Sequence, residues 1–365
     1  MIKSIFEKGA CGRKGYTLPQ TAIDEYTIDS IPHDLMRGEA YKAPCLNELD
    51  VAEHFVGLAT KNGNSMTNGE VYVQSIIDES ARLDGLTGIH PYQLADAGQG
   101  AFELLFTLRH MLSDMLGMDD VSMGAVRAKQ TLDAVLLMTK AYYADKKEKR
   151  STVLIGAKAC PCVAKAVEAA GFTVKRVEIT LDGVKAAADN DVALLLVRNP
   201  GLDGRFNGEI GEIVDAIHGV GGLCAADVSD MKGYIGITRP DDVGFDAIYF
   251  GLAELFSISD VKGGDSAYVL GVGNCLADYI PTPVVEMDEL EQYYFDYNRP
   301  KSVGKMNEFY GNFTAWIKAL GYILSLGFEG LVDVSKAVLL NTRYARANDQ
   351  KARVSEAADK TRIDG

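Results

Sequence analysis

The spacing of hydrophobic residues along this chain follows two different periods. Between residues 99 and 116, and again between 130 and 143, apolar side chains recur at helical spacing, which predicts two amphipathic helices. From residue 151 onwards, short apolar strands alternate with helical segments, which predicts an α/β domain with a mostly parallel central sheet and flanking helices. The predicted strands cover 152–155, 173–178, 192–197, 222–226, 246–250 and 267–272, and the predicted helices between them cover 161–170 and 208–218.

The carboxyl ends of these strands indicate where a ligand would bind. Residues 192–197 are entirely apolar, as expected of a central strand that is covered on both faces. In sheets of this class the ligand lies at the carboxyl edge of the strands. Asn199, Asp227, Ala253 and Glu254 closely follow predicted strands or end them, so the sequence puts the candidate site around these four residues.

Residues 244–264 are the stretch around which the rest of the chain is organised. They are predicted to form a buried strand, a tight turn, a polar segment and a Gly-Gly hairpin. Several enzyme families place a reactive side chain just after such a strand. In this chain that place is taken by Ala253 and Glu254.

The ends of the chain show a different pattern from its middle. Residues 1–50 have little periodicity and many turn residues, which indicates an extended N-terminal arm. Residues 51–280 are predicted to form one large α/β domain that begins with helices near 49–58 and 70–83. Residues 281–365 are predicted to be a helical, aromatic C-terminal segment with a polar tail from residue 345.

Composition restricts the class of protein. The 365 residues carry a net charge of -14, so there is no excess of Lys and Arg, and nucleic acids and anionic membranes are excluded as partners. Neither a signal peptide nor an apolar run of membrane-spanning length is present, so we expect a cytoplasmic protein.

The six cysteines are scattered and are expected to be reduced. The one close pair, Cys160 and Cys162, lacks zinc-site spacing, and we expect neither a metal site nor a redox function.

Several motifs spread over nearly the whole chain match one known family. Residues 5–19 resemble IFEKS…GRRAYSLP, and shorter matches lie at 117–122 (GMDAVSL) and 199–206 (NPNTLGLF). The longest matches are residues 238–246, similar to VRPGDMGFD, and residues 298–313, similar to DRPKSIG…FYGNF. On these motifs the chain is identified as a member of the family of glycine dehydrogenase (decarboxylating) subunit 2, the P-protein of the glycine cleavage system.

This resemblance implies a pyridoxal-phosphate (PLP) dependent transferase fold of type I, aminotransferase-like, whose C-terminal small domain is truncated here. Family members hold PLP on a lysine, decarboxylate glycine and pass the aminomethyl group to the lipoyl arm of H-protein. The chemistry needs that lysine, an acid that keeps the pyridine nitrogen protonated, and a glycine-rich loop at a helix N-terminus that holds the phosphate.

Most of these parts are replaced in this chain. Aligned without gaps, the family's lysine stretch NLHKTFS falls on residues 251–257, where Glu254 takes the place of the lysine and Ala253 that of the preceding histidine. A carboxylate cannot form an imine, and it would repel the phosphate of PLP. The family's loops AAGAHGE and SAHGTNP fall on 126–132 and 158–164. The former pocket therefore contains Lys129, Gln130, Lys158, Cys160, Asn199, Ala253 and Glu254.

One part of the cofactor site is kept. Asp227 ends a strand where the family's acid contacts the pyridine nitrogen, although an Asp at such a position also commonly caps a turn. Lys262 or Lys232 could replace the lost lysine if the loops differ from those of the family. Lys129 and Lys158 could bind an anion, or could pair with Glu254 and fill an unused cleft.

The losses concentrate in the cofactor pocket, while core strands, glycine caps and interface-like motifs are kept. We therefore expect a paralogue without PLP chemistry or cofactor, acting as a non-catalytic assembly or carrier-binding subunit. Its expected partners are a second copy in a homodimer, a P-protein subunit in a hetero-oligomer, or a lipoyl H-protein-like carrier. Two alternatives remain: an active PLP-dependent glycine dehydrogenase (decarboxylating) subunit with an unusual lysine, and a repurposed pocket that binds a small anion through Arg127, Lys129 or Lys158.

Overall fold

The computed structural model describes residues 75–83, 85–86, 94–201, 204–256 and 267–347, together with residues 53, 54 and 57. Contacts divide the chain into two compact units, Met1–Glu70 and Val71–Gly365, and the second contains the central sheet and the helices around it. The predicted N-terminal arm, the hairpin at 257–266 with Lys262, and the tail from residue 348 lie outside the described residues, and so does most of the helix predicted near 49–58. Of the helix predicted at 70–83, the structure describes α4 (Ser75–Ser80).

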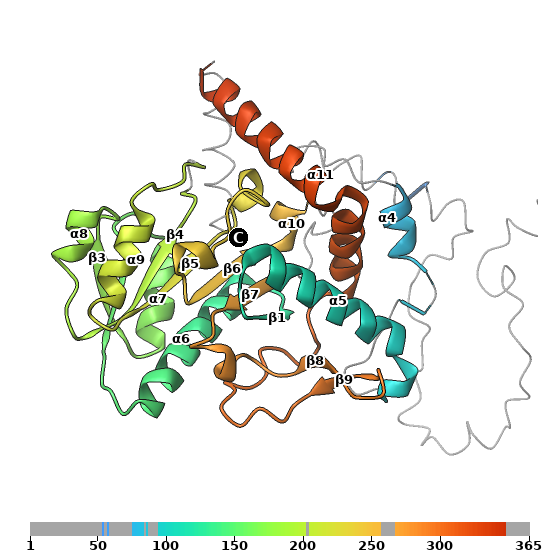
Figure 1. Cartoon of the computed structure of the whole chain (residues 1–365), viewed down its shortest axis with the longest axis horizontal. Coiled ribbons are helices and arrows are strands. Elements are labelled where there is room, and N and C mark those ends of the chain that lie inside the picture. The colour runs from blue at the N-terminus through green and yellow to red at the C-terminus, as the bar shows by residue number, and fades with distance from the viewer. Residues whose placement is uncertain are drawn as a thin grey trace, which may run out of the picture. The chain divides into compact units, whose positions relative to one another are not determined.

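A seven-stranded sheet forms the centre of the second unit, with strand order β1-β7-β6-β5-β4-β2-β3 (Figure 1). Strands β3, β2, β4, β5 and β6 pair in parallel, and β7 runs antiparallel between β6 and β1. The predicted α/β class with a mostly parallel sheet is therefore confirmed. The strands are β1 (Asp120–Ala125), β2 (Thr152–Gly156), β3 (Thr173–Val177), β4 (Val192–Arg198), β5 (Leu223–Asp227), β6 (Ala247–Gly251) and β7 (Tyr268–Val272).

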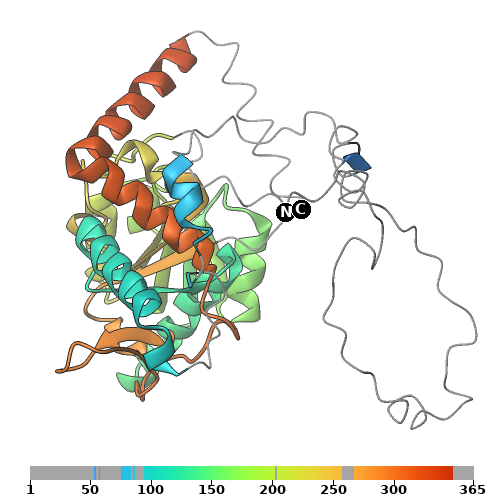
Figure 2. The same cartoon turned by 90° about the vertical axis from the view of Figure 1, so that its right-hand side faces the viewer.

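Helices cover both faces of this sheet (Figure 2). One hydrophobic cluster packs α5 (Gln99–Leu116), α9 (Ile210–His218) and the start of α11 (Phe313–Ala347) against one face. A second cluster packs α6 (Ala128–Asp145) and α7 (Pro161–Ala169) against the other face. The side chains of β4 from Val192 to Val197 are buried, as predicted for a central strand. The remaining short helices are α8 (Leu181–Lys185), α10 (Leu252–Leu255), η3 (Ala95–Ala97), η4 (Met231–Gly233), η5 (Asp241–Val243) and η6 (Ala277–Tyr279).

The end of α5 shows why two of the recognised motifs go together. Gly117 follows the helix with φ +75°, a conformation that favours glycine. A Cβ at this position would lie 2.9 Å from the Cβ of Asp241. The short GMD motif and the longer motif at 238–246 therefore meet in space, and a larger residue at 117 would push them apart.

Two predictions of local structure are wrong. The chain after residue 280 was expected to be helical, but β8 (Val284–Met287) and β9 (Tyr293–Asp296) first form a two-stranded antiparallel sheet. Adjacent β-branched valines favour this strand, and both Val284 and Val285 are buried. A tight turn was expected after residue 250, but α10 begins directly after β6.

Helix α11 is interrupted at Gly327, whose backbone angles (φ 61°, ψ -175°) lie outside the helical region. The break separates two helical segments, which are visible as the bend in α11 in Figure 1. Among the described residues, no helix combines the length and the hydropathy that a membrane crossing requires.

Candidate functional site

The carboxyl edge of the sheet brings three strand ends together. Arg198 of β4 pairs in register with Asp227 of β5, which in turn pairs with Tyr249 of β6. One carboxylate oxygen of Asp227, Oδ1, accepts the Ser229 N–H at 3.0 Å, and Oδ2 lies 3.9 Å from an Arg198 guanidinium nitrogen. Arg198 also pairs with Asp230 at 2.6 Å. Asp227 therefore ends β5, as the sequence predicted, and belongs to a local ionic and turn network; its role towards a cofactor stays a prediction.

Asn199 braces the loop beside Asp227. Its side chain is buried, its N–H donates to the Asp227 carbonyl at 3.1 Å, and its Oδ1 accepts the Asn207 N–H at 2.9 Å. Asn207 in turn donates to the Ile179 carbonyl at 3.1 Å. These bonds explain why the Asn199 side chain is buried: it holds the loop together, and no ligand is needed to account for its position.

The place of the expected lysine lies in α10, the short helix that follows β6. Ala253 and Glu254 belong to this helix, and the structure does not describe their side chains. Lys232 lies on η4, which contacts both α10 and α11. Burial lowers the pKa of Lys232. Of the two candidate lysines, the structure describes only Lys232, since Lys262 lies outside the described residues.

The start of α6 corresponds to the predicted cofactor loop. Gln130 Oε1 accepts the N–H groups of Val126 at 2.9 Å and of Arg127 at 3.1 Å, and the Gln130 N–H donates to the Arg127 carbonyl at 3.0 Å. The Gln130 side-chain amide also donates to Asn307. Backbone N–H groups at a helix start are what normally holds a phosphate. Here a side chain of the same helix already accepts two of them, those of Val126 and Arg127.

The cations predicted in the former pocket lie on the surface. Lys129 pairs with Asp133 at 2.6 Å along α6, and 73% of its side chain is exposed. Lys158 is exposed in the loop after β2. Both residues therefore face water, and Lys129 already has a carboxylate partner.

The expectation that every cysteine is reduced is wrong for one pair. Cys160 and Cys162 form a disulfide at the start of α7, with their Cα atoms 5.2 Å apart. That separation is within the usual range for disulfides, and the turn into the helix brings the two side chains to the same side. Cys224 and Cys275 are free.

The amino edge of the sheet carries a second polar cluster that the sequence did not indicate. Asp246 Oδ2 accepts the Cys224 N–H at 2.7 Å and pairs with His218 Nε2 at 2.8 Å, and its Oδ1 accepts the Cys275 thiol at 3.2 Å. The donor atoms of His218, Cys224 and Asp246 lie within 4.8 Å of one another, close enough to hold a metal ion. Hydrogen bonds already account for this arrangement, and we interpret the cluster as structural.

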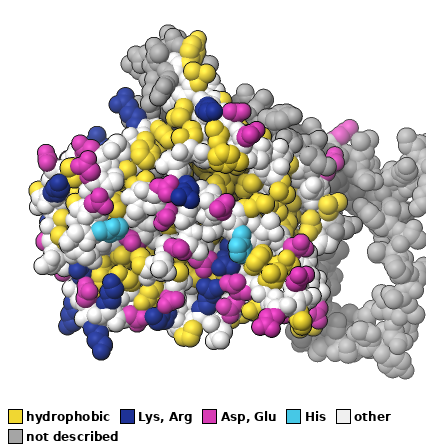
Figure 3. Space-filling model, viewed as in Figure 1, with side chains coloured by type: hydrophobic (Ala, Val, Ile, Leu, Met, Phe, Trp, Pro, Cys, Tyr) yellow, Lys and Arg dark blue, Asp and Glu magenta, His cyan; other side chains and the backbone are white. Residues whose placement is uncertain are grey.

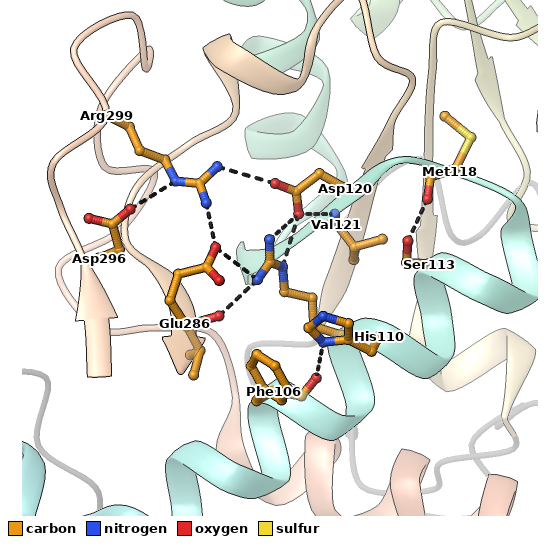
Figure 4. Close-up of polar contacts among 11 residues, drawn as sticks. Phe106, His110, Ser113, Met118, Asp120, Val121, Glu286, Asp296 and Arg299 are labelled. Atoms are coloured by element: carbon orange, nitrogen blue, oxygen red, sulfur yellow. Dashed lines mark hydrogen bonds and ion pairs between the residues drawn. The ribbon is translucent and has the colours of Figure 1, made fainter. Parts of the chain in front are cut away.

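A buried ionic network joins α5 and β1 to the two-stranded sheet (Figure 4). Arg109 Nε donates to Asp120 at 2.9 Å, and Arg109 Nη1 donates to the Val285 carbonyl at 2.8 Å and to Glu286 at 3.3 Å. Arg299 contacts Asp120 at 3.3 Å and Glu286 at 2.5 Å. Burial lowers the pKa of Arg109, but the carboxylates of Asp120 and Glu286 raise it. The net effect is a pKa above the ordinary value of an arginine. The network therefore keeps Arg109 charged.

Contacts within the chain explain why the motif at 298–313 has these residues. Besides the contacts of Arg299, Ser302 Oγ donates to the Ile280 carbonyl at 2.7 Å, and Asn307 donates to the Gly124 carbonyl at 2.8 Å. A Cβ on Gly311, whose φ is +64°, would collide with Trp316. The motif was predicted to serve assembly, and the structure gives these residues a role in holding the fold.

With this geometry established, comparison with known proteins identifies the family. The family model described as "Glycine cleavage system P-protein" matches residues 16–292. The probable glycine dehydrogenase (decarboxylating) subunit 2 of Caldanaerobacter subterraneus subsp. tengcongensis is 35% identical, over 98% of this chain and 76% of that protein. The protein of the same name from Fervidobacterium nodosum is 36% identical, over 95% of this chain and 75% of its own length. This chain belongs to the glycine cleavage system P-protein family.

Solved structures agree with the fold of a P-protein. The crystal structure of glycine decarboxylase (P-protein) in inhibitor-bound form has a TM-score of 0.65 at 20% identity, and covers 86% of this chain and 74% of that chain. The structure of the sphingosine-1-phosphate lyase of Burkholderia pseudomallei K96243 has a TM-score of 0.58 at 15% identity. The match covers 84% of this chain and 74% of that chain. At these identities the likeness concerns the fold, which is that of the type I PLP-dependent enzymes.

The residues present in this P-protein family member do not fit PLP well. The acid at Asp227 is kept, but it is shared with Arg198 and Ser229. The helix start that would hold the phosphate is capped by Gln130, and the place of the lysine carries Glu254. We therefore derive no reaction step through the cofactor.

Proposed function

We propose that this chain is a non-catalytic, cytoplasmic subunit of a P-protein assembly that works by binding a second P-protein subunit. The observation that carries the loss of catalysis is the capped start of α6. A phosphate there would have to displace Gln130 from the N–H groups of Val126 and Arg127, and from Asn307. Glu254, at the place of the family's lysine, supplies no amine that could form an imine.

An apolar surface on α11 supports the assembly role. Leu324, Phe328, Leu340 and Tyr344 expose between 61% and 71% of their surface. Figure 3 shows apolar side chains gathered over this part of the molecule. A cluster of large exposed apolar residues is typical of a protein–protein contact. A second P-protein subunit of the same fold is the occupant that we propose, because members of one family often pair through equivalent surfaces.

The experiment is a mass measurement of the full chain by light scattering during size-exclusion chromatography. The chain is run alone and then mixed with a catalytic glycine dehydrogenase (decarboxylating) subunit from the same host. We expect a particle that contains at least two polypeptides in one of the two runs. If the chain is strictly monomeric in both runs, the proposal is wrong.

One observation favours the active alternative enough to require a test. Burial lowers the pKa of Lys232, and a desolvated lysine is the kind that forms covalent links with aldehydes. The chain is incubated with PLP, treated with borohydride and digested, and the peptides are weighed. A label on the Lys232 peptide that disappears in Lys232→Ala would support an active enzyme, whereas an unlabelled chain would support the proposal above.

A further inference from the structure

The disulfide between Cys160 and Cys162 is placed where a thiol can reach it. Cys160 is half-buried and Cys162 is exposed, at the start of α7 in the loop that follows β2. A disulfide that serves only the core would be expected to be covered by other side chains. An accessible one is the more labile kind, since exchange requires a thiolate to approach a sulfur atom.

The surroundings of the pair favour a negatively charged sulfur. Cys160 is the N-cap of α7, and the Cys162 N–H donates to its Sγ at 3.3 Å. Arg176 donates to the carbonyls of Ala157 and Ala159 at 3.1 and 3.0 Å, so that a guanidinium lies against the loop that leads to Cys160. A helix N-terminus stabilises a thiolate, and the Arg176 guanidinium adds a positive charge to the same loop.

The other two described cysteines provide an internal contrast. Cys224 is buried, and Cys275 is half-buried with its thiol bonded to Asp246. Burial, and next the charge of Asp246, raise the pKa of Cys275 to about 12 and that of Cys224 well above its ordinary value. These thiols stay protonated and unreactive, so among the described cysteines exchange chemistry is restricted to the pair on α7.

We propose that Cys160 and Cys162 form a redox-active pair that exchanges electrons with small soluble thiols, a function independent of the assembly role. A thiolate attacks the exposed Sγ of Cys162, the Cys160–Cys162 bond breaks, and Cys160 leaves as a thiolate at the N-cap. A second thiolate then attacks the sulfur of the first thiol in the mixed disulfide. Two thiols become one disulfide, and the two cysteines receive two electrons and, from water, two protons.

The experiment uses the folded full chain in buffers of reduced and oxidised glutathione at a series of ratios. Free thiols are trapped with iodoacetamide, and the peptide that contains residues 160–162 is weighed. We expect this peptide to pass from no alkylated cysteine to two as the ratio rises, while Cys224 and Cys275 remain unlabelled until the chain is unfolded. A peptide that stays fully oxidised or fully reduced across the whole series would overturn the proposal.

Single variants test the order of attack. Cys160→Ser leaves the exposed sulfur without its partner, so one glutathione should accumulate on Cys162. Cys162→Ser should form the adduct on Cys160 at least tenfold more slowly, because that sulfur is half-buried. Cys275→Ser is the matched control and should behave as the unaltered chain. Equal adduct rates on the two single variants would contradict the assigned order, and the titration of the unaltered chain decides the proposal if a variant fails to fold.

Discussion

Arg109 shows most clearly what sequence periodicity misses at the scale of a residue. It lies beside the apolar positions Leu108 and Leu112 on α5, yet it is 8% exposed. Its partner Asp120 is eleven residues away, and Glu286 is 177 residues away. A charged residue next to an apolar helix face is normally assigned to solvent. Only the folded chain reveals the carboxylates that make its burial possible.

Replacing Arg109 with methionine should destabilise the protein strongly. The substitution keeps most of the side-chain volume but leaves Asp120 and Glu286 with fewer positive partners in a buried site. Breaking a buried pair in this way costs about 3–5 kcal/mol. The free energy of unfolding from urea titrations measures the effect.

Arg239→Ala is the control for this prediction. Arg239 also makes an ion pair, with Asp242 at 2.6 Å, but both side chains are more than half exposed. Exposed pairs contribute little to stability, so this variant should unfold at the same urea concentration as the parent. Equal losses in the two variants would show that burial of the Arg109 network is not what stabilises it.

His218 provides a pH-dependent prediction. Its hydrogen bond to Asp246 raises its pKa above 6.5, and Asp215 adds to the rise, while burial opposes it. Since the folded state binds the proton more tightly, the stabilisation is full below about pH 6.5 and is lost as the pH rises through the folded pKa. His218→Asn should therefore lower the melting temperature by about 2 °C at pH 5.5, allowing for the exposure of the ring.

The difference between the parent and His218→Asn should shrink by pH 9, where the imidazole is neutral in both the folded and the unfolded state. His110→Asn is the control, because His110 is exposed and its hydrogen bond and ring contact are both with Phe106 of its own helix. A constant difference from pH 5.5 to 9 would mean that His218 stabilises the fold by packing and not by charge.

At the scale of an element, the prediction was accurate where apolar residues recur regularly at helical spacing and a residue that ends a helix follows them. The predicted helix at 99–116 has the bounds of α5, because seven apolar positions recur and Gly117 ends it at positive φ. The β8–β9 pair was missed because its stability depends on distant partners. Gln99, for example, accepts the Tyr293 N–H at 2.9 Å and donates to the Tyr293 carbonyl at 2.8 Å.

The apolar surface of α11 leads to a prediction at this scale. Phe328→Glu places a charge on the helix whose exposed apolar residues also include Leu324, Leu340 and Tyr344. It should reduce association at least tenfold, because a charge at an apolar contact is costly to desolvate. The melting temperature of the isolated chain should not change, since Phe328 is 71% exposed. Light scattering against concentration measures the association.

Lys336→Ala is the matched control on the same helix. Lys336 is exposed and carries a weak ion pair with Asp333 at 3.7 Å, so its removal should leave association unchanged. If Phe328→Glu associates as well as the parent does, the apolar surface of α11 is not the contact.

At the scale of the whole molecule, the sequence predicted the class of fold. Alternating strands and helices indicated a mostly parallel sheet, and Asp227 does end a strand at its carboxyl edge. That a ligand binds at this edge stays a prediction. The strand order and the antiparallel β7 could not be predicted, because they depend on contacts between distant segments. Equally, Gln130 was assigned to the former pocket, but its capping of α6 became visible only in the structure.

We propose that this member of the P-protein family keeps the fold of the family but does not hold PLP. The most direct measurement is the absorbance spectrum of the purified full chain, with and without added PLP, followed by gel filtration. The variant Glu254→Lys, which restores the family's lysine, is measured beside it. We predict that neither protein retains PLP through the column, because Gln130 still closes the phosphate position. A parent chain that retains stoichiometric PLP and absorbs as a lysine adduct would contradict the account.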